Sequence, residues 1–286
     1  MSLFGEPLVP PPLSAETRRN HEARLLEART DFESDPHDPE AVIWLGRRTA
    51  YLGRYREAIA VYTRGIEEHP AYAQLYRHRG HRFITLRQFD RAIADLERAA
   101  SLIAGTSDEI EPDGLPNARN TPTSTSHSNI WYHLGLAYYL TGDLEQALRC
   151  YRECLSFSKN PDMLCATTYW LYLTLRRLGR AEEAAQALGP IRSDMDIIEN
   201  RSYHRLLLIY RGQLDAPSVL REARGDRSSV DFATIGYGVG SWYLADGQRR
   251  RALGLYREVR RTSSWAAFGH IAAEADLERL GEPPRR

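Results

Sequence analysis

The stretch SNIWYHLGLAYYLTGDLEQALRCYRECLSFSKNP, residues 128–161, decides how the rest of the chain is interpreted. Apolar residues recur at spacings of three and four on both sides of Gly142 and Asp143, which is the period of an α-helix. Gly142 can adopt the positive φ that ends one helix, and Asp143 can cap the next. The stretch therefore predicts two helices joined by a tight turn. Such a hairpin is only marginally stable alone, so it implies similar neighbours.

The same pattern recurs along the chain around one alanine in the second helix of each predicted pair. These alanines are Ala58, Ala92, Ala147, Ala184 and Ala252. The first two are 34 residues apart, and the last two are twice 34 apart. The step between the second and the third is one period plus 21 residues, which indicates an insertion. A helix-turn-helix unit with this period predicts a stacked repeat array.

The residues of the quoted stretch also resemble a known family. Six of them are similar to the consensus of the tetratricopeptide repeat: Trp131, Leu134, Gly135, Tyr138, Ala147 and Tyr151. Pro70 and Pro161 stand near the position of its closing proline. About six copies cover residues 39–266, of which the fourth has Ala181 where an aromatic residue is usual and the fifth is interrupted near Pro217. The resemblance implies an all-α fold, a right-handed α-solenoid of helix-turn-helix repeats.

The repeat pattern and the prolines divide the chain into four predicted segments. Residues 1–13 form an extended segment because prolines exclude a helix, and residues 14–36 form an N-terminal capping helix. Residues 37–280 form the solenoid, and residues 281–286 form a tail. A last amphipathic helix, from about Ser264 to Leu280, is expected to cover the exposed end of the array.

Composition excludes several classes of function. Lys plus Arg and Asp plus Glu both number 38, so no net charge favours nucleic acid or a membrane surface. No apolar run approaches the ~20 residues that span a bilayer, so we expect no membrane insertion. Three cysteines cannot form a disulfide framework. The chain as it stands predicts a cytoplasmic protein, or an exported one if a signal peptide has been removed.

Two irregular stretches interrupt the repeats. The insertion, GTSDEIEPDGLPNARNTPTSTSH at residues 105–127, is too long for an ordinary turn and too polar for a helix. Long loops of this kind are either solvated insertions or functional, and we expect this one to act as a lid. The second stretch, GYGVGS at residues 236–241, resembles a phosphate-binding loop only superficially, because it lies inside a predicted helix. Its glycines are interpreted as sites of close helix approach.

The resemblance implies a concave groove lined by the first helices of the repeats. The residues expected to bind are Trp44, Arg47, Tyr51, Arg77, His78, His81, His127, Asn129, Tyr132, His133, Tyr139, Trp170 and Arg177, with Tyr169, Arg176, Tyr203 and Tyr210 on the same face. Aromatic faces and arginine forks suit a peptide segment of a protein partner or a small anionic ligand. The alternative for each aromatic residue is packing between helices. The lysines that some family members use to bind carboxylates are absent from the inward positions.

Other hypotheses use the same residues. A metal site from His78, His81 and His133 is conceivable, but no Cys or Glu stands at ligand spacing, so no metal and no cofactor are expected. Catalysis would need the hydroxyls of residues 121–126 beside these histidines, in a small-molecule acid-base or hydrolytic enzyme under the insertion. A structural oligomer that assembles through the convex face is the third possibility, and the oligomeric state stays open.

Overall fold

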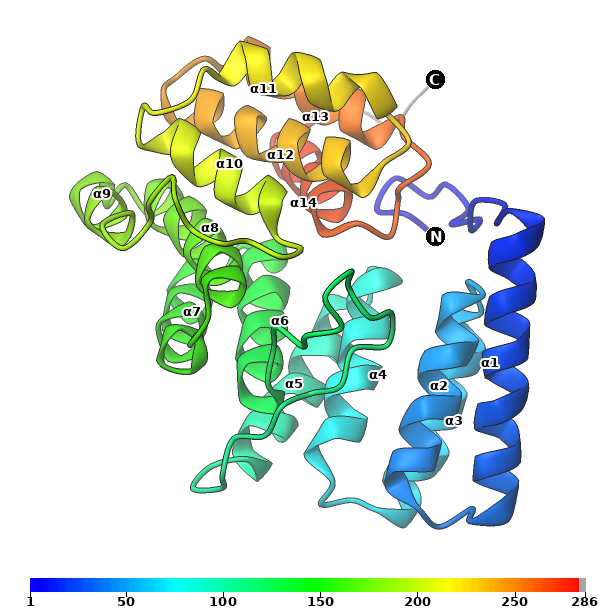
Figure 1. Ribbon diagram of the computed structural model, residues 1–286. Helices are drawn as coiled ribbons and strands as arrows, with labels where there is room; N and C mark the ends of the chain where they lie inside the picture. The colour runs from blue at the N-terminus through cyan, green and yellow to red at the C-terminus, as the bar shows by residue number, and fades with distance from the viewer. Residues whose placement is uncertain (283–286) are drawn as a thin grey trace.

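The computed structural model describes residues 1–282, and its regular structure is helical apart from one isolated bridge between Ile110 and Thr125. The predicted all-α helical solenoid is confirmed (Figure 1). The helices are α1 (Ala15–Ser34), α2 (Pro39–Tyr51), α3 (Tyr55–Glu68), α4 (Ala73–Thr85), α5 (Phe89–Leu102), α6 (Ser126–Thr141), α7 (Leu144–Phe157), α8 (Pro161–Arg177), α9 (Ala181–Ala187), α10 (Arg201–Tyr210), α11 (Ala216–Ala223), α12 (Val230–Ala245), α13 (Arg249–Arg260) and α14 (Phe268–Arg279), with a 3₁₀ turn, η1 (Arg224–Asp226). Residues 283–286 of the predicted tail lie outside the described residues.

Each repeat is a pair of helices joined by a turn that needs a left-handed residue. In the quoted stretch Gly142 ends α6 with φ 90°, and the Asp143 carboxylate accepts a hydrogen bond from the backbone N–H of Gln146 in α7. The predicted hairpin is therefore confirmed with both of its capping residues. The turn between α4 and α5 differs, because Arg87 takes the left-handed conformation there with φ 61°. An arginine occupies this position because its side chain makes buried contacts, which are described below.

Small residues set how closely the two helices of a pair approach. All five alanines of the predicted series are 0% exposed. In the quoted stretch, a Cβ atom added at Gly135 would lie 2.8 Å from the ring of Tyr151, so the glycine makes room for this tyrosine. Two glycines of residues 236–241 allow close approach on different sides of α12: a Cβ atom at Gly240 would lie 2.7 Å from Tyr256 of the paired helix α13, and one at Gly238 would lie 2.5 Å from Leu206 of α10. The prediction of close helix approach in α12 is confirmed.

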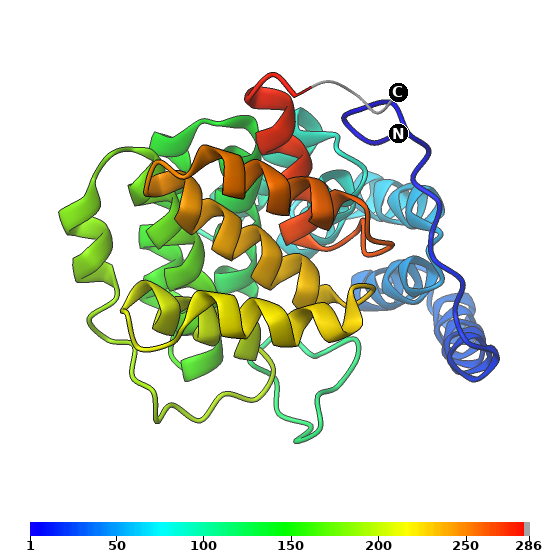
Figure 2. The ribbon, with the colours of Figure 1, turned by 90° about the horizontal axis from the view of Figure 1, so that it is seen from above.

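The C-terminal helices fold back over the concave side of the array. Helix α14 packs against α12 and α13, and it also contacts α6. Figure 1 shows α10 to α14, yellow to red, as a layer across the green helices α6 and α8, and the view from above in Figure 2 shows the same overlap. The last helix was expected to cover the exposed end of the array, and it packs against the last helix pair, α12 and α13, and in addition against α6.

Buried charges join α14 to earlier repeats. Arg87 Nε donates to Glu274 Oε2 at 2.8 Å, and both side chains are 2% exposed. A second guanidinium nitrogen of Arg87 donates to the carbonyl oxygen of Trp265 at 2.8 Å. On the other side of α14, Arg177 lies 3.5 Å from Asp276. These pairs connect the second and fourth helix pairs to the C-terminus.

The N-terminal segment connects the two ends of the chain. Trp265 Nε1 donates to the backbone oxygen of Val9 at 2.7 Å, and Arg260 lies 2.9 Å from the carboxylate of Glu6. A Cβ atom at Gly53 would lie 2.6 Å from Pro10, so the segment also packs on the turn between α2 and α3. The first and last repeats are thereby held near each other, and the array is closed.

We predict that Glu274→Ala lowers the free energy of unfolding by about 3 kcal/mol or more, because it leaves the buried guanidinium of Arg87 without its carboxylate. Asp196→Ala removes a carboxylate from the exposed ion pair with Arg119 and should leave stability unchanged. Urea unfolding followed by circular dichroism would measure both. Equal stability of the two variants would contradict the structural role given to the buried pair.

Candidate functional site

The predicted site residues separate into three groups. Arg47, Tyr51, Arg77, His78 and His81 meet in one pocket of about 140 Å³, between α2 and α4. We call it the basic pocket, and its remaining lining residues are Ala50, Tyr62, Arg82 and Glu111. The second group lies in the core, and the third lies at the start of α6. Only the first group forms an accessible site.

Helices α2 and α4 present the charged residues of the basic pocket. Arg77 is buried in α4, and its Nη2 atom lies 2.8 Å from Oε1 of Glu111, which belongs to the insertion. Burial lowers the pKa of Arg77, and the Glu111 carboxylate opposes this effect. Arg77 Nε and Glu111 Oε2 are buried without a hydrogen-bond partner in residues 1–282. Each side chain of the pair therefore has one polar atom left for a further hydrogen bond, Arg77 Nε as a donor and Glu111 Oε2 as an acceptor.

Two more arginines add positive charge that no carboxylate neutralises. Within residues 1–282, Arg47 and Arg82 take part in no ion pair. The guanidinium of Arg47 lies 4.5 Å from the ring centre of Trp44, and that of Arg82 lies 5.5 Å from Tyr55. Aromatic rings thus hold both cations without cancelling their charge. Trp44 acts as a support for the arginine in this arrangement.

The insertion crosses the mouth of the basic pocket. Arg48 Nη1 donates to the carbonyl oxygen of Gly114 at 2.6 Å. A Cβ atom at Gly114 would lie 1.6 Å from the hydroxyl oxygen of Tyr51, so this residue must be small. The backbone N–H of Glu111 donates to Ser124 O at 3.1 Å, which ties the two arms of the insertion together. Figure 1 shows the insertion running in front of α4 and α6.

Three histidines lie beside the arginines and are held neutral. The ring centres of His81 and His133 are 4.5 Å apart, and the ring of Phe268 from α14 lies close to both. Burial holds the pKa of His78 and that of His133 well below the usual range, with Arg77 adding to the effect. The pKa of His81 is lowered in the same way by burial and by Arg82. Neutral rings fit a site that already contains several cations.

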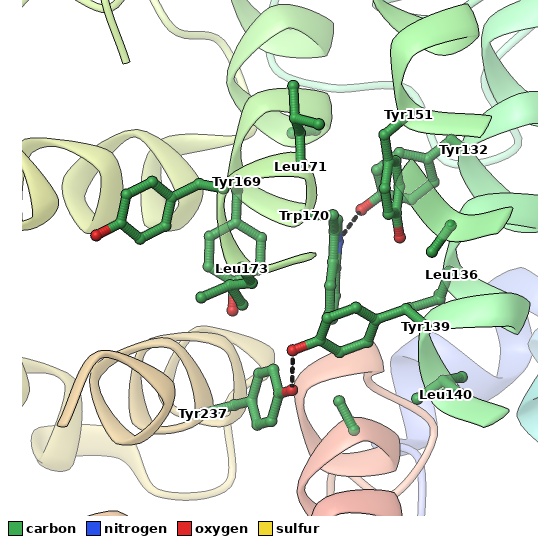
Figure 3. Close-up of a cluster of buried hydrophobic side chains, with 14 of the residues drawn as sticks. Tyr132, Leu136, Tyr139, Leu140, Tyr151, Tyr169, Trp170, Leu171, Leu173 and Tyr237 are labelled. Carbon is green, nitrogen blue, oxygen red and sulfur yellow. Dashed lines mark hydrogen bonds between the residues drawn. The ribbon is translucent and has the colours of Figure 1, made fainter. Parts of the chain in front are cut away.

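The second group was expected on an open groove and is instead in the core. Trp170 is 0% exposed and Tyr139 is 1% exposed. Trp170 Nε1 donates to the hydroxyl oxygen of Tyr132 at 2.8 Å, and the hydroxyls of Tyr139 and Tyr237 are 2.7 Å apart (Figure 3). Because α12 and α14 cover this part of the concave face, Tyr132, Tyr139, Trp170 and His133 cannot meet a ligand there. The packing alternative holds for these residues.

Arg177, the last residue of this set, borders a different pocket. Its guanidinium lies 4.4 Å from the ring centre of Tyr139. Together with Arg176 and Asp276 it lines a hollow of about 440 Å³ between α8, α12 and α14. Each of the two arginines has a carboxylate partner, Asp246 for Arg176 and Asp276 for Arg177. Arg177 is therefore separated from the basic pocket and serves to connect α8 to α14.

The third group shapes the beginning of α6. His127 Nε2 lies 3.2 Å from Thr106 Oγ1, and its ring packs edge-on against Phe157. Asn129 Nδ2 donates to Ser124 Oγ at 2.9 Å. Both contacts position the two ends of the insertion. His127 and Asn129 thus act on the insertion and do not line the basic pocket.

Within residues 1–282, the structure does not bring together the side chains that the metal and catalytic alternatives require. Among residues 1–282, no three His, Cys, Asp or Glu side chains converge in a way that could hold a metal ion. The hydroxyls of the insertion are used elsewhere: Thr125 caps α6, and Thr123 donates to Glu199. In the described part of the chain none of them is hydrogen-bonded to His78, His81 or His133.

Sequence reasoning missed Arg48, Arg82 and the role of Glu111. Arg82 follows His81 directly, so a wider inward stripe would have included it. Glu111 carried a weaker signal: it is one of four acidic residues between positions 108 and 113, and nothing in the sequence selects the one that is buried. The pairing with Arg77 spans a loop whose path depends on the whole concave face.

A sequence comparison agrees with the helix pairs, their spacing and their buried alanines. A family model described as tetratricopeptide repeat matches residues 128–161, the stretch that forms α6, α7 and the turn between them. The chain therefore contains a tetratricopeptide repeat. The other helix pairs are copies of this unit, with the insertion between the second and the third.

Other proteins resemble this chain over lengths that range from about a quarter of the protein to the whole of it. The BBSome complex member BBS4 of Bos taurus is 26% identical over 145 residues, which is 51% of this chain and 23% of that protein. The structure of MamA has 16% identity and a TM-score of 0.46, and the match covers 72% of this chain and 100% of MamA. YrrB, described as a TPR protein with an unusual peptide-binding site, has 14% identity and a TM-score of 0.46, and the match covers 88% of this chain and 97% of YrrB. Among the described residues of the tetratricopeptide repeat protein, no helix has the length and apolar character to cross a membrane.

We predict that this tetratricopeptide repeat protein loses stability as the pH falls below about 6.5. His78, His81 and His133 have lowered pKa values in the folded state, so the unfolded chain binds protons that the folded chain does not. Below pH 6.5, each histidine lowers the free energy of unfolding by up to about 1.4 kcal/mol for each unit that the pH falls. Above pH 7 the ring is neutral in both the folded and the unfolded chain, so this loss is absent. Unfolding in urea at pH 5.5, 6.5 and 7.5 would measure the slope.

The variant His81→Gln is the control for this prediction. It removes one titrating ring at the only one of the three positions that is not fully enclosed, so it should make the pH dependence shallower by about a third. An unchanged slope would show that other groups cause the loss of stability.

Proposed function

We propose that this protein is an interaction scaffold whose basic pocket binds a carboxylate-bearing, extended segment of a protein partner. The observation that carries the proposal is the excess of positive charge in the pocket. Arg47, Arg77 and Arg82 line it together, and Glu111 is the one carboxylate among its lining residues. An anionic ligand would remove this imbalance.

The chemistry of the pocket favours a carboxylate. Arginine forks bind carboxylates through two parallel hydrogen bonds, and such bonds are stronger where water is excluded. Arg77 is 7% exposed, so a carboxylate that reaches it would be largely desolvated. The ring of His78 lies beside Arg77, with its Nδ1 atom 3.0 Å from Arg77 Nη1. Because this ring is neutral, it lines the pocket with polar atoms and adds no further charge. A small anionic ligand shares this chemistry, but the neighbouring surface favours a longer one.

A second pocket continues the binding surface towards α10 and α12. It measures about 390 Å³, and we call it the acidic pocket because Glu199 and Asp231 line it, together with Tyr203 and Phe268. His81 lines both pockets, so the two are neighbours. A peptide segment that runs from one to the other would place its carboxylate on the arginines and its apolar or cationic residues on the acidic pocket.

The insertion is the lid in this proposal. Its backbone lies over the basic pocket at Gly114, and its outer part reaches the loop before α10, where Arg119 pairs with Asp196 at 2.6 Å. That pair is exposed, so little stability opposes its opening. The lid role needs the release of this exposed pair and also of the contacts of Arg77 with Glu111 and of Arg48 with Gly114.

We predict that the double variant Arg47→Gln, Arg82→Gln binds acidic peptides about a hundredfold more weakly, roughly tenfold for each lost charge-assisted contact. Fluorescence polarisation with a panel of labelled acidic, neutral and basic peptides would measure the affinities. The acidic peptides should bind best, and their affinity should fall with added salt.

The matched control combines Arg29→Gln with Arg64→Gln, since both arginines border a separate hollow lined by α1 and α3. It removes the same charge and should leave the affinity unchanged. Acidic peptides that bind equally well to the double variant and to the control would rule out the basic pocket as their site.

A further inference from the structure

The insertion binds both pockets of the proposed surface at the same time. Glu111 occupies the basic pocket through Arg77. Farther along, Asn117 Nδ2 lies 3.5 Å from Glu199, a lining residue of the acidic pocket, and Thr123 donates to the same carboxylate. A solvated loop would not need to bury its glutamate, yet Glu111 is 7% exposed.

The contacts of Glu111 resemble those of a bound ligand, because its side chain is buried against Arg77 but is only partly hydrogen-bonded. One of its oxygens contacts Arg77, and the other is buried with no hydrogen-bond partner in the part of the chain that the structure describes. An unpaired buried carboxylate oxygen is costly. The nearby Asp113 also has a raised pKa because of burial and the charge of Glu199. The insertion thus occupies the surface without fitting it fully.

We propose that residues 111–119 of the insertion are an internal ligand that competes with the partner for the basic pocket. The inference rests on the proposed function, because it takes the basic pocket as the binding site. The partner must then share the chemistry of the insertion: an extended segment with a glutamate or aspartate, followed by an amide side chain six residues later in place of Asn117 or a cationic one eight residues later in place of Arg119.

Competition of this kind lowers the apparent affinity without changing the site. If the insertion occupies the pocket nine-tenths of the time, the partner binds about tenfold more weakly than to a free pocket. The insertion is attached to α5 and α6, so its effective concentration stays high at any protein concentration. A partner succeeds when it fits the pocket better than Glu111 does.

Two changes in the insertion should free the pocket without altering its lining arginines. Glu111→Gln removes the charge that binds Arg77. Gly114→Val places side-chain atoms where a Cβ atom alone would lie 1.6 Å from the hydroxyl of Tyr51 and 2.8 Å from Arg47. The matched controls are Glu109→Gln and Ala118→Val, which make the same kinds of change at exposed positions of the insertion.

The probe is a synthetic peptide with the sequence of residues 108–120, titrated calorimetrically into the chain of residues 1–286 and each variant of it. We expect Glu111→Gln and Gly114→Val to bind it about tenfold more tightly than the unaltered protein, and the two controls to match the unaltered protein. A second peptide with glutamine in place of the glutamate that corresponds to Glu111 should bind all of them more weakly. Thermal melts would verify that each variant is folded, and Glu111→Gln carries the test if Gly114→Val does not fold.

Equal affinity of the unaltered protein and both variants overturns the internal ligand. If that binding still requires Arg47 and Arg82, the proposed function stands. Absence of binding to every folded variant, including those with a freed pocket, overturns the proposed function together with this inference.

Discussion

The contact between the last helix and the middle of the array is the constraint on which the rest of the structure depends. Helix α14 packs on α6 and carries Glu274 and Asp276 to arginines of two different repeats. Taking charges out of water is costly, so these carboxylates are stable only where guanidinium groups meet them. The position of α14 is therefore fixed, and it closes the concave face along α6 and α8.

This closure decides where a ligand can bind. In an open solenoid every first helix would expose its inward residues, whereas here those of α6 and α8 form the core shown in Figure 3. Helix α14 contributes no lining residue to the basic pocket between α2 and α4, although its Phe268 lies close to His81, so the arginines of this pocket keep their charge. The surface that remains is short and basic, and its neighbour is acidic. A polar pattern of this kind gives specificity more than affinity.

The parts of the fold that depend on nearby residues could be predicted from the sequence. The turn at Gly142 and Asp143 and the buried alanine series follow from spacing within one repeat. The closure could not be predicted, because Arg87 and Glu274 are 187 residues apart and no local pattern relates them. The same reason explains the site. Arg47, Tyr51, Arg77, His78 and His81 were predicted together and lie together, whereas Tyr139 and Trp170 were assigned to a groove that the C-terminal helices fill.

Arg87 shows what this closure means for how the chain folds. Its left-handed backbone is a conformation that costs a residue with a side chain of the order of 1 kcal/mol, and glycine stands at the corresponding turn of the first repeat, Gly53. The side chain offsets this cost only when α14 is in place. Repeat arrays usually fold by adding neighbours one at a time, with each unit stable once the next has formed. In this chain the second unit is completed by a residue 187 positions farther along the sequence, so an array of local hairpins becomes one cooperative body.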